Sequence, residues 1–128
     1  MREIKFRAWH KEKKEIVNVE EIDFMNKVIN YIDNDYLNNR QEIIGAYFED
    51  IELMQYTGLK EKNNKEIYEG DIVKFLNDIF EVIWRDEKAK FMLKNKEYKE
   101  FLNFLYENNT EMEIVGNIYE NPELMEDE

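Results

Sequence analysis

The chain has 128 residues, of which 43% are apolar and 14% aromatic, enough for one domain or two small interlocked subdomains with a real core. Its net charge of −12 disfavours sequence-independent binding to duplex nucleic acid, because polyanions are repelled on average. It has no cysteine, no serine and a single histidine, His10, which excludes disulfides, Ser-His and Cys-His hydrolase sites and multi-histidine metal sites. No run approaches the roughly 20 apolar residues of a membrane span, and the N-terminus is charged, so we expect a cytoplasmic protein without membrane contact.

The first part of the chain predicts an antiparallel β-structure. Ile4, Phe6 and Ala8 alternate with polar or aromatic neighbours, which indicates a half-buried strand, and the charged residues 10–14 suit a hairpin loop before a strand at 16–19. A further strand is expected at 28–32, and the polar residues 33–40 are expected to form a loop. Residues 41–48 fit a strand or a helical turn. Residues 51–56 restore the alternation of a strand.

The central segment carries the most informative pattern. Residues 54–59 and 67–74 are apolar runs that contain Gly58 and Gly70, and the polar pair Asn63-Asn64 lies between them. Glycine and asparagine tolerate positive φ, so the segment predicts strand, turn, hairpin tip, second turn and strand.

The rest of the chain predicts three short strands, a helix and a last strand. The strands are expected at 71–76, 79–85 and 91–93, and a final one at 111–118. The helix is expected near 97–107, because Tyr98, Phe101, Leu102 and Leu105 recur at spacings of three and four. After the last strand, Asn121-Pro122-Glu123 has the order of a helix N-cap, a first-turn proline and a first-turn acid.

These elements predict an α+β fold that is mainly β. The first part, residues 1–57, is expected to be an antiparallel hairpin or sheet. The second part, residues 58–128, is expected to be a small SH3-like barrel with one short helix, because a meander of short strands with a helical crossing is typical of that fold.

Three motifs, in order, resemble one known family. Residues 2–9, REIKFRAW, resemble the opening of YopX-like proteins, residues 54–59 and 67–73 resemble their central signature, and residues 116–124 resemble their ending. The YopX family is an uncharacterised group of phage and prophage proteins. The resemblance implies a mainly β, phage-encoded protein without established catalytic residues to carry over. His10 departs from the pattern, since the family more often has an acid after the Trp.

Two groups in the central signature are candidate binding residues. Glu69 and Asp71 flank Gly70 and could bind a divalent cation or act as an acid and a base, but Asp beside Gly more commonly holds a turn through its amides. Gln55, Tyr56 and Thr57 could contact a peptide or a base edge. The simpler interpretation is a strand end whose polar groups pair with neighbouring backbone.

The N-terminal strand carries the best nucleic-acid signal in the chain. Lys5, Arg7, Trp9 and His10 are expected to project from one strand face and its loop, a basic surface with an aromatic that could stack on a single-stranded base. The alternative is that Trp9 packs under the sheet, while the basic side chains neutralise acidic residues in the rest of the chain or in a neighbouring copy. The segment 33–35 begins like a calcium loop, but the later ligand positions hold apolar residues, so that site is rejected.

The sequence favours a binding role over catalysis, with no catalytic residue, metal or cofactor. We expect a phage or prophage accessory protein that binds an unidentified protein partner and forms a homo-oligomer, because Trp84, Phe104 and Tyr106 are more apolar surface than a small barrel hides. The alternatives are an acidic decoy that imitates DNA, a metal-dependent enzyme and a single-stranded nucleic-acid binder. The predicted partner-binding residues are Arg7, Trp9, Gln55, Tyr56, Thr57, Glu69 and Asp71.

Overall fold

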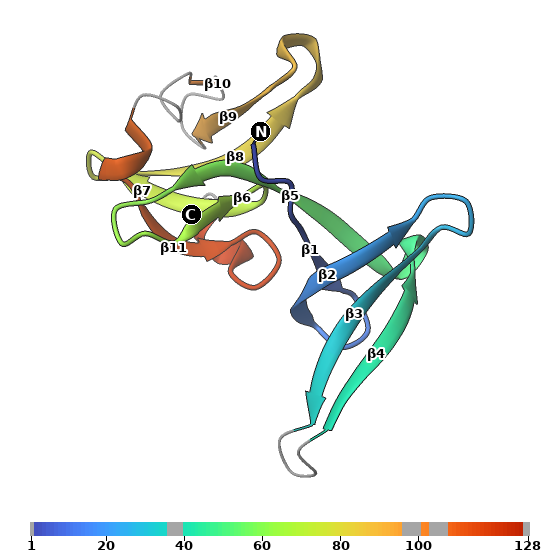
Figure 1. Ribbon diagram of the computed structural model, residues 1–128. Helices are drawn as coiled ribbons and strands as arrows, with labels where there is room; N and C mark the ends of the chain where they lie inside the picture. The colour runs from blue at the N-terminus through green and yellow to red at the C-terminus, as the bar shows by residue number, and fades with distance from the viewer. Residues whose placement is uncertain (1, 36–39, 96–100, 103–107, 127–128) are drawn as a thin grey trace. The chain divides into compact units, whose positions relative to one another are not determined.

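The computed structural model describes residues 2–35, 40–95, 101–102 and 108–126 (Figure 1). The chain divides into two compact units. The N-terminal unit comprises residues 4–55, and the C-terminal unit comprises residues 56–128 together with residues 1–3. No helix in the described ranges is long and apolar enough to cross a membrane.

Antiparallel strands build the N-terminal unit. They are β1 (Phe6–His10), β2 (Glu15–Asp23), β3 (Val28–Asp35), β4 (Arg40–Tyr47) and the first half of β5 (Ile51–Lys60), with the 3-10 helix η1 (Phe48–Asp50) before β5. Their order in the sheet is β4-β3-β2-β1-β5. The predicted loop at 33–40 is too long, because β3 continues to Asp35 and β4 begins at Arg40. The undecided segment 41–48 is a strand over almost all of its length.

The core of the N-terminal unit follows from strand alternation. Ala8, Val17, Ile29, Tyr31, Ala46 and Ile51 form one buried cluster. Side chains two residues apart lie on the same face of a strand, so Ile29 and Tyr31 of β3 both enter it. His10 is also buried, two residues after Ala8 in β1. The prediction that His10 belongs to an exposed basic surface is therefore wrong.

A second antiparallel sheet builds most of the C-terminal unit. Its strands are β7 (Asp71–Phe75), β8 (Asp78–Arg85), β9 (Lys90–Asn95), β10 (Phe101–Leu102) and β11 (Glu113–Asn117), in the order β10-β9-β8-β7-β11. Strand β6 (Glu66–Tyr68) pairs with the second half of β5. Short 3-10 helices are η2 (Asp86–Lys88), η3 (Asn109–Glu111) and η4 (Pro122–Met125). The predicted helical turn after Asn121 is thus present as η4.

A separate buried cluster fills the C-terminal unit. It comprises Ile67, Val73, Phe75, Phe80, Val82, Phe91, Leu93 and Met112. The strand alternation that buries Phe80 and Val82 of β8 does not bury Trp84. Trp84 is 42% exposed and touches Phe91 edge-on, with the ring centroids 5.0 Å apart.

Two expectations about the C-terminal unit need correction. Phe101 and Leu102 form strand β10 against β9, so the predicted helix near 97–107 is wrong at these two residues. Its other positions, Tyr98 and Leu105 included, lie outside the described residues. The mainly β character is confirmed, but the five-stranded sheet ends in β10 and β11 without a ladder between them in the described ranges, so barrel closure is not confirmed.

Candidate functional site

Strand β1 is central in its sheet and carries Arg7 and Trp9. Its neighbours are β2 and β5, and Trp9 lies opposite Ile16 on one side and Glu52 on the other. Both Arg7 and Trp9 are half-buried, and the Nε atom of Arg7 is fully enclosed. Gln55 is the position opposite Phe6 in the same sheet. The basic strand is therefore part of a packed sheet more than an open rim.

The residues around Gly58 use their polar groups on the chain's own backbone. The hydroxyl of Thr57 donates to the Ile67 carbonyl at 2.7 Å and accepts from the Leu59 amide at 3.2 Å. Gly58 has a φ of 87°, and the register with β6 is irregular here, so the predicted turn is a bulge within β5. Tyr56 is buried, with its ring 5.4 Å from that of Tyr68.

Asp71 organises the turn between β6 and β7. Its Oδ2 accepts the Tyr68 amide at 2.7 Å, and the carboxylate is buried. Gly70 has a φ of 89°, its amide donates to the Val82 carbonyl at 2.8 Å, and its carbonyl accepts the Ile118 amide at 2.9 Å. Asp71 therefore bonds a turn amide and Gly70 supplies positive φ, as the simpler interpretation of this motif predicts.

Glu69 lies close to another acid of the same unit. Burial raises the pKa of Glu81, Lys94 partly offsets that effect, and the charge of Glu69 raises the pKa further. Among the described residues, no group of three or more His, Cys, Asp or Glu side chains could hold a metal ion. The geometry brings together Tyr56, Thr57 and Asp71 around β6, whereas Arg7, Trp9 and Gln55 belong to the sheet of the other unit.

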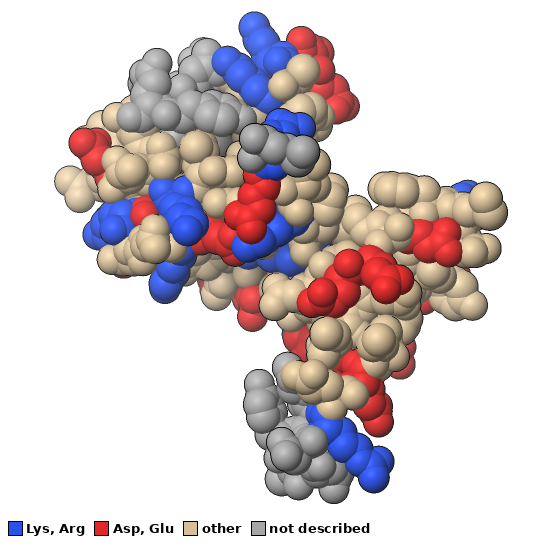
Figure 2. Space-filling view, viewed as in Figure 1, with Lys and Arg blue, Asp and Glu red and all other residues tan. Residues whose placement is uncertain are grey.

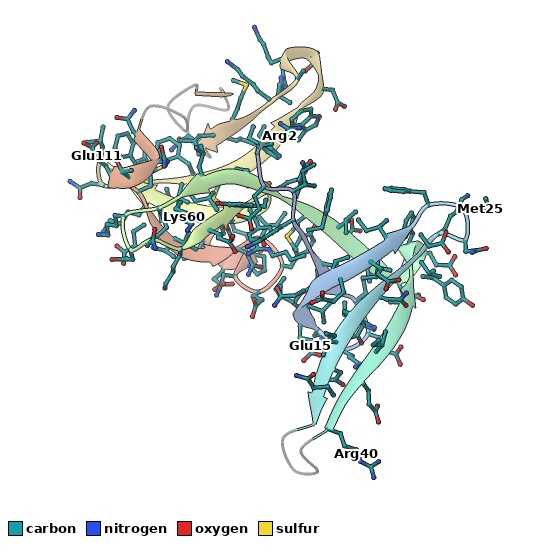
Figure 3. All side chains as sticks on the ribbon, in the orientation of Figure 1. Arg2, Glu15, Met25, Arg40, Lys60 and Glu111 are labelled. Carbon is teal, nitrogen blue, oxygen red and sulfur yellow. The ribbon has the colours of Figure 1, made fainter. Side chains whose placement is uncertain are left out.

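An exposed apolar surface lies in the N-terminal unit, at residues that the sequence did not single out. Phe24 and Met25 occupy the β2–β3 turn and are 73% and 90% exposed, and Figure 3 shows Met25 at the tip of this hairpin. Ile43 and Tyr47 of β4 are 75% and 61% exposed. In the sequence, Phe24 and Met25 are an apolar pair between polar residues. Strand alternation alone does not decide whether such a pair is buried or exposed.

The turn that carries Phe24 and Met25 has its own bracing. The Asp23 carboxylate accepts the Asn26 amide at 3.0 Å and the Asn26 side-chain amide at 2.7 Å, and both contacts lower the pKa of Asp23. The Phe24 ring meets the Phe48 ring edge-on, with 6.2 Å between their centroids. Met25 is therefore presented on a braced turn, which limits the entropy that a binding partner would have to remove.

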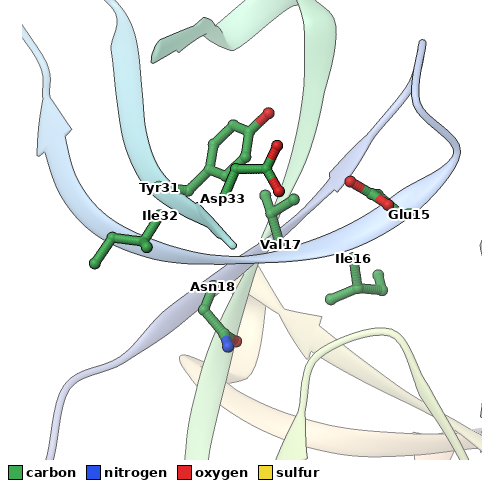
Figure 4. A pocket seen from close by; sticks show the side chains of 7 residues that line it. All are labelled: Glu15, Ile16, Val17, Asn18, Tyr31, Ile32 and Asp33. Atoms are coloured by element: carbon green, nitrogen blue, oxygen red, sulfur yellow. The ribbon is translucent and has the colours of Figure 1, made fainter. Parts of the chain in front are cut away.

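A polar hollow of about 220 Å³ lies between residues of β2 and β3 (Figure 4). It is lined by Glu15, Ile16, Val17, Asn18, Tyr31, Ile32 and Asp33. The Lys13 ammonium lies 3.6 Å from the Asp33 carboxylate and 5.3 Å from the centre of the Tyr31 ring. The Tyr31 hydroxyl raises the pKa of Lys13 but has no hydrogen-bond partner of good geometry among the described residues. The ammonium group of Lys13 is thus a cation that already contacts both Asp33 and Tyr31.

Comparison with known proteins gives a family and a solved structure of similar size. No curated protein matches the chain. A crystal structure of protein EF1440 from Enterococcus faecalis is 29% identical, with a TM-score of 0.64, over 98% of this chain and 100% of that one. The family described as YopX protein matches residues 5–126, nearly the whole chain. The resemblance drawn from the three sequence motifs is confirmed: the chain belongs to the YopX family.

Proposed function

We propose that this chain is a phage or prophage accessory protein that acts in the host cytoplasm as a protein-binding module and associates with itself. The observation that carries the proposal is the exposed apolar surface of Phe24, Met25, Ile43 and Tyr47. The N-terminal unit has its own filled core, so these side chains are not needed to complete it. Burying one large apolar side chain at an interface contributes roughly 1.5–3 kcal/mol.

The residue types at this surface suit protein recognition. Aromatic residues and methionine are enriched at the centres of protein interfaces, where charged side chains are depleted. Phe24 and Met25 are adjacent and held on a braced turn. We assign them as the anchor for the protein partner. The seven residues predicted from the sequence stay a prediction, and Tyr56 and Asp71 are the least accessible of them.

The alternatives from the sequence have less support. An acidic decoy of DNA needs carboxylates in a regular row, whereas Figure 2 shows acidic and basic side chains on the same visible surface. A single-stranded nucleic-acid site on β1 would need Arg7 and Trp9 to be open, and both are half-buried. A metal-dependent enzyme at Glu69 and Asp71 would need Asp71 to give up its hydrogen bond to the Tyr68 amide.

Site-directed photo-crosslinking tests the proposed anchor. A photoreactive phenylalanine analogue at position 25 is compared with the same analogue at position 76, because Leu76 is equally apolar and 79% exposed but lies in the other unit. In cells that produce the phage proteins, we expect a discrete cross-linked protein from position 25 and none from position 76. Equal smears from both positions would contradict the anchor. Light scattering of the pure chain tests self-association, and a single monomer mass at all concentrations would contradict it.

A further inference from the structure

Strand β4 is the edge of its sheet and has one strand partner. In the described part of the chain it pairs with β3 from Val28 opposite Tyr47 to Asp35 opposite Arg40, and no strand lies on its other side. Figure 1 shows β3 and β4 as one long hairpin. The open side is eight residues long, which is ample for pairing with another chain.

The register fixes which backbone groups face the open side. The Phe48 amide donates to the Lys27 carbonyl at 2.8 Å, so Phe48 directs its backbone toward β3. Backbone direction alternates along an antiparallel strand. Ile43, Gly45 and Tyr47 therefore direct their N–H and C=O groups outward, away from β3.

The same three residues also share one face of the sheet. Ile43 and Tyr47 are exposed there, and Gly45 between them leaves a hollow of about 210 Å³ lined by Val28, Asn30, Gly45, Ala46 and Tyr47. A Cβ atom on Gly45 would lie 3.3 Å from the Asn30 Oδ1 atom, so a side chain at this position would close the hollow. The exposed side chain of Ile43 therefore lies two residues along β4 from this hollow.

Natural edge strands are usually protected by lysine, proline or inward-pointing charge. Strand β4 has none of these from Ile43 to Tyr47, and its charged residues, Arg40 and Glu42, are both at its beginning. Figure 3 shows Arg40 at the end of the hairpin remote from Met25. The second half of the edge is thus an unprotected apolar strand.

We propose that two copies of this chain pair antiparallel through β4, about a twofold axis at Ile44. This register places Ile43 opposite Gly45 of the partner subunit, so each isoleucine enters the hollow of the other copy. It also places the outward-facing N–H and C=O groups of the two strands opposite each other, so that they can form hydrogen bonds between the copies. The inference rests on the proposed self-association and identifies its contact surface.

Side-chain pairing favours an axis at Ile44 over an axis at Glu42 or Ile43. An axis at Ile44 places Glu42 opposite Ala46 of the partner subunit, so that no two carboxylates face each other. An axis at Glu42 would oppose two carboxylates, which is unfavourable for directly facing strand positions. An axis at Ile43 would leave the Gly45 hollow to the polar Gln41 of the partner subunit.

A single-cysteine scan tests both the interface and its register, because the chain has no cysteine of its own. Glu42→Cys, Ile43→Cys and Ile44→Cys each report one possible axis. Residue 44 would face its own copy as a pair without ladder hydrogen bonds, with Cα atoms about 4.5 Å apart, a distance that a disulfide can span. On mild oxidation we expect a disulfide dimer from Ile44→Cys alone. A dimer from position 42 or 43 instead would overturn the register, and no dimer from any position would overturn the proposed pairing about Ile44.

A charge on the edge tests the same contact without a disulfide. Ile43→Lys is compared with Leu76→Lys, since both residues are highly exposed and neither belongs to a buried cluster. In a twofold dimer both copies carry the substitution, so its effect on the interface is counted twice. We expect Ile43→Lys to raise the dimer dissociation constant about a hundredfold and Leu76→Lys to leave it unchanged. Circular dichroism checks that both variants fold.

Sedimentation of the unmodified chain separates the two possible failures. A wild-type chain that self-associates while Ile43→Lys assembles equally well would overturn the β4 interface and leave the proposed function standing. A wild-type chain that stays monomeric up to high micromolar concentration would overturn self-association and the β4 interface together.

Discussion

Glu61 shows how one carboxylate can hold a loop that the sequence marks only as polar. Its Oε1 accepts the amides of Asn63 at 2.7 Å and Lys65 at 3.2 Å, and its Oε2 accepts the Ile114 amide at 3.2 Å. The side chain therefore joins the β5–β6 loop to β11. Burial raises the pKa of Glu61, but these backbone amides outweigh it and leave the pKa below its ordinary value.

Glu61→Gln is expected to lower the free energy of unfolding at neutral pH by about 1–3 kcal/mol, because an amide N–H₂ group would face a backbone donor. A folded-state pKa below the unfolded one gives stability that is present above the ordinary pKa of 4.5 and is lost as pH falls through the folded value. The difference between wild type and variant should therefore shrink in acid. Urea unfolding at several pH values measures it, and a difference that is constant with pH would contradict the role of the charge.

Gly116 is required by the close approach of Asn121. A Cβ atom on Gly116 would lie 2.5 Å from the Asn121 Oδ1 atom. That oxygen accepts the Asn117 amide at 3.2 Å, so Asn121 does not cap helix η4 through its side chain as its position predicted. The Asn117 Oδ1 atom in turn accepts the amides of Tyr119 and Glu120 at 3.0 and 2.8 Å.

Gly116→Ala is expected to destabilise the C-terminal unit by about 1–3 kcal/mol, because the added methyl displaces Asn121 and breaks its hydrogen bond to Asn117. The matched control is Gly116→Ala combined with Asn121→Gly, which makes room for the methyl and should recover part of the loss. Thermal unfolding of both variants measures the effect. A single variant as stable as wild type would show that the loop shifts without cost.

At the scale of elements, the β7–β8 hairpin carries a local strain. Leu76 and Asn77 form its two-residue turn, with φ values of 52° and 61°. Two-residue hairpin turns of this kind favour glycine, asparagine and aspartate, since a leucine resists positive φ. Leu76 is also 79% exposed, so the burial of its side chain does not offset the conformational strain.

Leu76→Asn is expected to raise the free energy of unfolding by about 0.5–1 kcal/mol, because asparagine adopts positive φ more readily than leucine. Leu76→Val should act in the opposite direction, since a β-branched residue resists this conformation most. The midpoint of urea unfolding compares the three chains. Equal midpoints would show that the turn stores no strain.

Much of the strand pattern could be predicted, because alternation directly reports which face of a strand is buried. The N-terminal hairpin and the turn around Gly70 follow from such local signals. Segment 41–48 could not be assigned, since its adjacent apolar pairs Ile43-Ile44 and Tyr47-Phe48 fit neither period, and pairing with β3 decides it. Phe101 and Leu102 follow a helical spacing, yet pairing with β9 overrides it.

At the candidate site, only the local hydrogen bonds of the turn residues could be predicted from the sequence. The sequence located Asp71 and Thr57 because aspartate, threonine and glycine have characteristic local roles, and the structure gives both the hydrogen bonds of the simpler interpretation. The exposure of Ile43 and Met25 could not be predicted. Whether an apolar residue faces solvent depends on the register of its strand, which a sequence specifies only through all of its neighbours together.

At the scale of the whole molecule, the described residues form two buried clusters that share no residue. One cluster contains Ala8, Ile29 and Tyr31, and the other contains Val73, Val82 and Leu93. The strand β5 belongs to both units, since its first half pairs with β1 and its second half with β6. Two separate cores allow each unit to open with its own free energy.

Ile29→Ala and Leu93→Ala test this independence, since each residue is fully buried in one core. Either substitution is expected to cost its own unit about 2–5 kcal/mol through lost burial and a residual cavity. Native-state hydrogen exchange should then show faster exchange in β2 and β3 for Ile29→Ala, with β8 and β9 unchanged, and the reverse for Leu93→Ala. If either variant accelerates exchange in both sets of strands equally, the two units unfold as one, and β5 transmits the full loss from one core to the other.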